Sequence, residues 1–276
     1  MVASIYAEFR GQLGGKVYNF NLPTTWVQNQ TYTSAQLVQL AYTMLARILV
    51  YTPRTPEERA TVNWQKVLDA TSKGLTYDFG PTLQSGLLTS TYFDRMQATT
   101  RARADNKLVG PSDVSGNYQA WLARRRNGAA TTLQALTATV DENRLLRAEA
   151  MFRTGNLTEA ANLINVSRTR AVRIGTTTHP GLPAVTATGV PESTPTAPCV
   201  PRTNTGACGS LLDALRYERQ IELAGLDPMR AWMDYRGFGQ LTSGTILQMP
   251  IPGRYLVSLE IPLYTFGGVG GQSAAR

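Results

Sequence analysis

Residues 145–170, LLRAEAMFRTGNLTEAANLINVSRTR, decide the fold. Apolar and small side chains recur in this stretch about every 3.6 residues, which predicts two amphipathic helices. Gly155 separates the helices at a position typical of a C-cap. The small alanines would let the two backbones approach closely, so the stretch predicts a helical hairpin. The side chains expected on the inward faces are Ala148, Met151, Phe152, Leu157, Ala160, Ala161, Ile164 and Ser167.

A second predicted hairpin lies earlier in the chain. Residues 34–51 carry an apolar stripe that follows Ser34, which we expect to be the N-cap of a helix. Pro53 and Pro56 must end this helix, and residues 63–75 form the next one. The spacing of such helix pairs matches the tetratricopeptide hairpin. The stripe comprises Leu37, Leu40, Ala41, Met44, Leu45 and Ile48.

The rest of the chain contains fewer predicted helices and more irregular segments. Helices are expected over residues 132–154, 211–223 and 229–235. Residues 80–128 mix aromatic rings with polar residues, residues 174–209 form a low-complexity loop rich in Thr, Pro and Gly, and the tail from residue 242 is expected to form loops and short extended pieces. No strand-rich block is apparent. The sequence therefore predicts an all-α fold of tetratricopeptide-like helical hairpins with long irregular loops.

Length and charge exclude some classes of protein. A chain of 276 residues is long enough to bury a sizeable core, and no apolar run approaches the roughly 18 residues that cross a bilayer. The 27 basic and 19 acidic residues give a formal net charge of +8, which permits a polyanionic partner. The arginines are scattered, however, and only residues 124–126 form a dense run. A nucleic-acid partner is therefore not expected.

Cys199 and Cys208 are the only two cysteines and lie in the Thr- and Pro-rich loop. Two thiolates at this spacing do not complete a tetrahedral metal site, and His179 is the only histidine. An oxidising compartment would join the two cysteines in a small ring, which contributes on the order of 2–3 kcal/mol to stability. We therefore expect a disulfide, no bound metal and an exported protein.

Three segments of the chain together resemble the SusD/RagB family of nutrient-binding outer-membrane lipoproteins. Residues 147–171, RAEAMFRTGNLTEAANLINVSRTRA, resemble the family's RAEA hairpin. Residues 211–241, LLDALRYERQIELAGLDPMRAWMDYRGFGQL, resemble its segment around the sequence ERRRELA and are the most specific of the three. The sequence MPIP at residues 249–252 resembles the family's PIP motif, which lies close to the C-terminus.

The resemblance implies a helical tetratricopeptide scaffold that displays ligand-binding loops. It also implies non-enzymatic capture of an oligosaccharide or another nutrient at the outer membrane or cell surface, together with a TonB-dependent transporter and without a cofactor. Family members are usually longer and begin with a lipoprotein signal and an acylated cysteine, which this sequence does not show. We expect a single SusD-like domain over residues 1–276 without the usual N-terminal region, in which residues 174–209 form an inserted loop.

Two other functions fit a helical scaffold. The same scaffold without its usual N-terminal region could serve as a repeating, self-associating subunit of an extracellular assembly. A cytosolic tetratricopeptide adaptor is the third hypothesis, and the two cysteines and residues 211–241 argue against it.

Glu218, Arg219 and Glu222 invite an enzymatic interpretation, because two carboxylates one helical turn apart can share a proton or a metal. The alternative is an ion-pair network, which the family resemblance favours. The arginines expected to pair with the two glutamates are Arg216, Arg219, Arg230 and Arg236. No Ser–His–Asp or Cys–His set is apparent in the sequence. We therefore expect no enzymatic activity and no catalytic residues.

Ligand-binding residues are expected in the irregular region, residues 80–128. Aromatic rings can stack on the apolar faces of sugars, while amide and guanidinium groups bind the hydroxyl groups at the rim. The candidates are Tyr92, Phe93, Tyr118 and Trp121, together with Arg95 and Asn117. The alternative is that these rings pack the loops against the helices.

Overall fold

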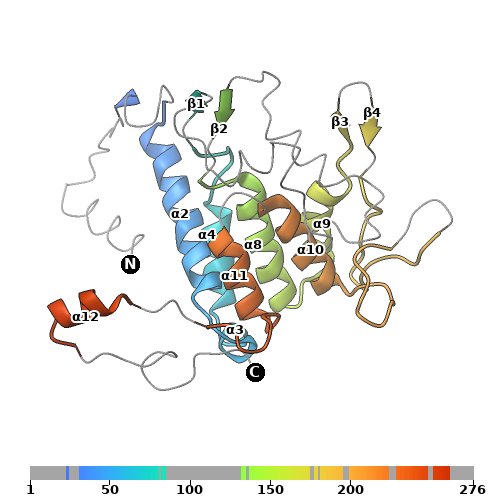
Figure 1. Cartoon of the computed structure of the whole chain (residues 1–276). Coiled ribbons are helices and arrows are strands. Elements are labelled where there is room, and N and C mark those ends of the chain that lie inside the picture. The colour runs from blue at the N-terminus through green and yellow to red at the C-terminus, as the bar shows by residue number, and fades with distance from the viewer. Residues whose placement is uncertain are drawn as a thin grey trace. The chain divides into compact units, whose positions relative to one another are not determined.

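The computed structural model describes residues 23–24, 31–80, 82–84, 132–134, 137–174, 177–179, 181–194, 199–223, 228–247 and 251–261. Helices dominate this part of the chain, as predicted, and the few strands are three residues long (Figure 1). The chain divides into two compact units. Unit 1 comprises residues 1–47 and 63–227, and unit 2 comprises residues 48–62 and 228–276. No helix of the described ranges has both the length and the apolar character needed to cross a membrane.

Unit 1 is built around a group of packed helices. Its helices are α2 (Ser34–Tyr51, of which residues 48–51 belong to unit 2), α4 (Trp64–Ser72), α8 (Val140–Arg153), α9 (Leu157–Arg168) and α10 (Leu211–Leu223). Helix α8 packs against α4 on one side and α9 on the other, and α10 packs against both α8 and α9 (Figure 1).

Two short antiparallel ribbons accompany these helices in unit 1. Strand β1 (Thr82–Gln84) pairs with β2 (Thr132–Gln134), with Leu83 opposite Leu133. Strand β3 (Val172–Ile174) pairs with β4 (Thr177–His179), with Arg173 opposite Thr178. The ribbons lie in segments that the sequence analysis assigned to helix or loop.

The hairpin α8–α9 forms where the sequence predicted it. Helix α8 ends in a Schellman-type cap, in which Gly155 adopts a φ of 85° and its N–H donates to the Phe152 carbonyl. The predicted start at residue 132 was wrong, because β2 occupies residues 132–134 and α8 begins at Val140. The Thr139 hydroxyl fixes this start by accepting a hydrogen bond from the Glu142 N–H at 3.0 Å.

The hydrophobic core of unit 1 lies between α8, α9 and α10. Ala148, Ala160 and Ile164 are fully buried in it, so the predicted inward faces of the hairpin are confirmed at these positions. Small side chains at 148 and 160 permit the close helix crossing that the sequence predicted. The other buried members are Leu145, Ala161, Val185, Val190, Cys199, Leu211, Ala214 and Leu215.

Helix α2 spans the predicted residues 34–51, but two details of the prediction were wrong. Thr33, not Ser34, is the cap, because its hydroxyl accepts from the Gln36 N–H while its own N–H donates to the Gln36 side chain. The buried face includes Thr43 and Ala46, whereas Ile48 is 58% exposed. Ile48 follows Ala46 by two positions and is therefore rotated about 200° away from it around the helix axis.

The remaining predicted helices agree with the structure within a few residues. The helix predicted over residues 63–75 is α4, for which the Asn63 side chain is the N-cap and accepts from the Lys66 N–H. The helix predicted over residues 211–223 coincides with α10.

Unit 2 is the smaller part and contains α3 (Pro56–Ala60), α11 (Pro228–Gly237) and α12 (Gly253–Ser258). The buried Arg59 of α3 donates to Asp234 of α11 at 3.0 Å, and its guanidinium lies 3.9 Å from the centre of the Phe238 ring. The helical turn predicted over 229–235 lies within α11, whereas α3 and α12 were not predicted. Helix α12 lies in the tail that was expected to form loops and extended pieces.

Replacing Gly155 tests the hairpin turn. Open space surrounds the Cβ position, so Gly155→Ala adds only the backbone cost of a left-handed conformation. We expect the free energy of unfolding, measured by urea denaturation, to fall by about 1–2 kcal/mol. Gly155→Asn is the matched control and should cost less, because Asn tolerates this conformation better than Ala. Equal stability of Gly155→Ala and the original chain would contradict a left-handed backbone conformation at Gly155.

Candidate functional site

The six residues predicted to bind a ligand, Tyr92, Phe93, Arg95, Asn117, Tyr118 and Trp121, lie outside the described residues. Two other features that could support binding or catalysis lie within the described residues. One is the segment closed by the predicted disulfide, and the other is a network of buried charges on α8, α9 and α10.

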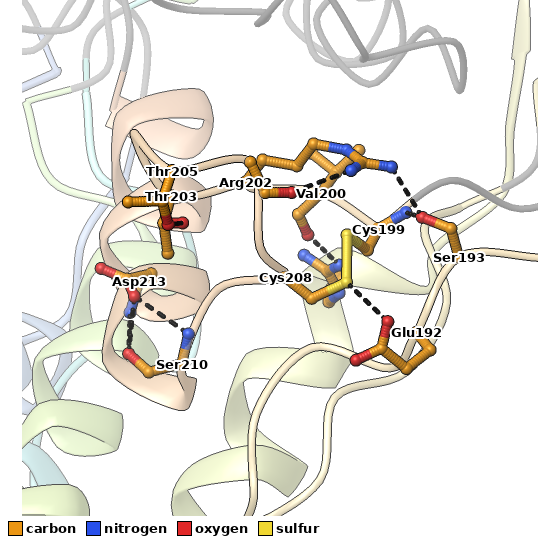
Figure 2. Close-up of a disulfide and its surroundings, with 12 residues drawn as sticks. Glu192, Ser193, Cys199, Val200, Arg202, Thr203, Thr205, Cys208, Ser210 and Asp213 are labelled. Carbon is orange, nitrogen blue, oxygen red and sulfur yellow. Dashed lines mark hydrogen bonds between the residues drawn. A yellow bond between two sulfur atoms is a disulfide. The ribbon is translucent and has the colours of Figure 1, made fainter.

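The predicted disulfide between Cys199 and Cys208 is confirmed, with the two Cα atoms 5.6 Å apart. Cys199 is buried, with only 1% of its surface exposed, whereas Cys208 is partly exposed. Glu192 and Ser193 lie beside the bond (Figure 2). The Ser193 hydroxyl accepts a hydrogen bond from the Cys199 N–H, and one Glu192 carboxylate oxygen lies 3.5 Å from the Cys208 sulfur.

The residues enclosed by the disulfide form an ordered hairpin at the surface. The Thr203 N–H donates to the Ala207 carbonyl at 2.8 Å, and Gly206 adopts a φ of 86° at the turn. Arg202 spans the hairpin by donating to the Gly206 carbonyl and to the Ser193 hydroxyl. All six residues from 202 to 207 are exposed. The ring therefore presents a polar tip of defined conformation.

The inner side of the same segment belongs to the core. Val185, Val190 and Cys199 are buried with residues of α8, α9 and α10 in one hydrophobic cluster. The Asn165 side chain of α9 both donates to the Val185 carbonyl and accepts from the Val185 N–H, at 2.9 and 2.8 Å. Segment 181–209, which comprises residues 181–194 and 199–209 of the described chain, is therefore a cover of the helical core as well as a surface loop.

Arg168, near the end of α9, is the polar centre of this cover. Its side chain is completely buried. The guanidinium donates to the Pro183 carbonyl at 2.7 Å, to the Val200 carbonyl and to Glu218 of α10 at 3.2 Å. A buried guanidinium needs such partners, because an uncompensated charge in the interior is strongly destabilising. Arg168 thereby joins the cover to α10.

The next residue of α10 makes a second buried ion pair. Arg219 donates to Glu149 of α8, and both side chains are at most 1% exposed. Arg153, one turn further along α8, lies 3.6 Å from the other oxygen of the Glu149 carboxylate. Helix α10 is therefore bound to α9 through Glu218 and to α8 through Arg219.

These partners differ from the ones expected from the sequence. The sequence analysis expected nearby arginines as partners of Glu218 and Glu222. For Glu218 the partner described is Arg168, 50 residues earlier, and Arg219 itself pairs with Glu149, 70 residues earlier. Arg216 pairs with Asp213 within α10, and Arg236 donates to the Tyr51 and Leu247 carbonyls in unit 2. Local spacing could not identify the partners, because they lie on other helices.

A further charged cluster surrounds Asp141 in the first turn of α8. Arg144 and Arg170 both pair with its carboxylate. Burial by itself would raise the pKa of Asp141, but the charge of Arg144, a side-chain hydrogen bond with Glu222 and the charge of Arg170 outweigh burial and hold the pKa well below its usual range.

Three buried acids of α8 and α10 are paired with arginines: Glu142, Glu149 and Glu218 each accept from a guanidinium. Within the described ranges, no group of three or more His, Cys, Asp or Glu side chains is placed to hold a metal ion.

Sequence reasoning missed the residues of α8 that take part in the network. Glu142 and Glu149 are seven residues apart, on one face of α8, and both are fully buried. The same face carries the buried Leu145 and Leu146. Two acids within an apolar helix face were a signal in the sequence that these carboxylates have buried cationic partners.

Comparison with protein-family models, with curated protein sequences and with solved structures finds no match to this chain. The likeness to the SusD/RagB family is therefore carried by the three sequence segments alone.

Removing one partner of the Glu149–Arg219 pair should be costly. Arg219→Met leaves the buried Glu149 carboxylate without its partner from α10, so we expect the free energy of unfolding to fall by about 3–5 kcal/mol. The double variant Glu149→Leu/Arg219→Met should be more stable than Arg219→Met, because it removes both buried members of the pair. Urea denaturation of the variants measures both effects.

The exposed pair Lys73–Asp69 on α4 provides the control for this experiment. Lys73→Met should change the free energy of unfolding far less than Arg219→Met does, because water already solvates both exposed charges. The buried pair would be refuted if the double variant lost as much stability as Arg219→Met and Glu149→Leu together.

Asp141 should make the free energy of unfolding depend on pH in the acid range. Its pKa is lower in the folded than in the unfolded chain, so its ionised form stabilises the fold at neutral pH. This contribution is complete above the ordinary aspartate pKa of about 3.9 and is lost as the pH falls toward the pKa of the folded state. Asp141→Asn should therefore be less stable at pH 7 and should lose less stability between pH 4 and pH 3, as measured by urea denaturation. Parallel pH curves for the two proteins would contradict this assignment.

Proposed function

We propose that this protein is an exported, non-enzymatic scaffold of the SusD/RagB type. It captures an oligosaccharide or another nutrient at the cell surface and acts together with a TonB-dependent outer-membrane transporter. In this proposal α8 and α9 form a tetratricopeptide-like hairpin, and loops supported by the helices hold the ligand.

One observation carries the proposal. Two of the segments that resemble the family make buried contacts with each other. They are residues 147–171 and 211–241, and the contacting side chains belong to the matching sequences. Glu149 and Arg168 of the first segment pair with Arg219 and Glu218 of the second. Segments that resemble one family by chance would have no reason to join through these residues.

The disulfide supports the location that the proposal assigns. Disulfides persist in oxidising compartments and are rare in the cytosol of mesophiles. The Cys199–Cys208 bond is therefore expected in a protein that works outside the cytosol.

The pairing of the buried acids supports a non-enzymatic function. A general acid or base needs a pKa near the working pH and access to the substrate. Glu149 and Glu218 are buried and each is paired with an arginine, so neither carboxylate is accessible to a substrate in solution. Their arrangement suits a rigid support for loops rather than proton transfer.

A second candidate function is a structural subunit of an extracellular assembly. It is favoured by the apolar side chains in and around α12, since Ile251, Tyr255, Val257, Leu259 and Ile261 are each at least 44% exposed. Closely spaced exposed apolar side chains are typical of protein interaction surfaces. Sedimentation of the chain at increasing concentration distinguishes the two functions, because a subunit of an assembly forms polymers and a nutrient receptor does not.

Binding of the chain to a broad glycan array tests the proposed function. We expect saturable binding of at least one oligosaccharide, weakened about tenfold or more by Tyr118→Ala/Trp121→Ala, which removes two rings available for stacking. Tyr255→Ala is the matched control, because it removes an exposed aromatic ring from α12 and should leave binding unchanged. An array without any bound glycan would count against a glycan ligand.

A further inference from the structure

The disulfide-closed ring is coupled to the buried charges through the residue that follows Cys199. The Val200 carbonyl accepts a hydrogen bond from Arg168, and Arg168 also donates to Glu218. Cys199 and Val200 are each 1% exposed, so the start of the ring is part of the interior while its tip is at the surface. Breaking the disulfide would therefore affect the Val200 carbonyl, which is a hydrogen-bond partner of the buried Arg168.

We propose that the Cys199–Cys208 disulfide is a redox latch on the cover of unit 1. While the bond is intact, residues 199–209 are held over Arg168. When a dithiol reduces the bond, these residues detach from the core, and helices α8, α9 and α10 remain folded. This device is independent of whether the protein binds a glycan.

The reduction is a thiol–disulfide exchange with a dithiol as the reductant. One thiolate of the dithiol attacks the Cys208 sulfur, the S–S bond breaks, and Cys199 leaves as a thiolate with the bonding electron pair. The second thiolate of the dithiol then attacks the dithiol's first sulfur, which is bonded to Cys208 in the mixed disulfide. This attack releases Cys208 as a thiolate. The protein gains two electrons, and the dithiol becomes a cyclic disulfide.

The surroundings of the two sulfur atoms determine where and how fast this attack occurs. Cys208 is partly exposed and Cys199 is buried, so an incoming thiolate reaches Cys208 first. The Glu192 carboxylate, 3.5 Å from the Cys208 sulfur, repels an approaching thiolate. Glu192 therefore slows the opening of the latch.

The hydrogen bonds of the cover show which part reduction can release. The Gly209 N–H donates to the Pro201 carbonyl, and the Val190 N–H donates to the Gly209 carbonyl, so both bonds depend on the position of the ring. The contacts of Asn165 with Val185 and of Arg168 with Pro183 precede the ring in the cover. Residues 182–185 are therefore expected to stay attached after reduction.

Hydrogen exchange of the full chain with and without dithiothreitol tests the latch. We expect exchange in peptides that contain Val190, Thr203 and Gly209 to rise about tenfold or more on reduction, and exchange in α8 and α9 to change less than about twofold. The double variant Cys199→Ser/Cys208→Ser should show the open pattern without the reductant and should not respond to it. Reduced and alkylated chain serves the same purpose if this variant does not fold. Unchanged exchange in the ring, or an equal rise throughout the helices, would overturn the proposal.

The role of Glu192 is tested by the rate of reduction. Glu192→Gln should be reduced about two- to fivefold faster by dithiothreitol at low ionic strength, because the charge that repels the thiolate is gone. The difference should largely disappear at about 1 M salt, where the Debye length is about 3 Å. Equal rates for the two proteins at low salt would remove Glu192 from the latch.

Discussion

The arrangement of unit 1 depends on two consecutive residues of α10 that bind different helices. Glu218 pairs with Arg168 of α9, and Arg219 pairs with Glu149 of α8. Apolar side chains could slide past one another by part of a turn at little cost, but a buried charge that loses its partner is strongly destabilising. The two pairs therefore fix both the rotation of α10 and its position along the hairpin. A shift of α10 by one residue would break both pairs at once.

Helix α8 extends the same constraint to the rest of unit 1. Its buried Glu142 accepts from Arg47 of α2 at 2.8 Å, and the neighbouring Asn143 accepts from the Thr43 hydroxyl. Asn143 also donates to the Thr71 carbonyl of α4. Gly74 lies so close to the Asn143 side chain that any residue with a Cβ at position 74 would clash with it. Polar groups buried in this way must all be satisfied, so α8 specifies the positions of its neighbours as well as packing against them.

The features that were predictable from the sequence are those determined by neighbouring residues. The periodic apolar pattern, Gly155 at a helix end and the cysteine pair each depend on local chemistry, and α9, α10 and the disulfide were predicted correctly. The start of α8 was missed although Thr139 and Glu142 form a recognisable capping sequence. The partners of Glu218 could not be predicted, because the composition of a helix does not reveal which distant helix faces it. The predicted ligand-binding residues lie outside the described part of the chain.

The segment predicted as an inserted loop shows how composition can conceal a structural role. Thr, Pro and Gly dominate residues 174–209, yet Val185, Val190 and Cys199 are buried in the core and the backbone supplies two partners of Arg168. Three apolar side chains and a few carbonyls suffice, because the helices provide the rest of the packing. A loop that is already ordered loses less conformational entropy when it binds a partner. Under the proposed function, attachment to the charged core would therefore let this segment bind at a lower entropic cost.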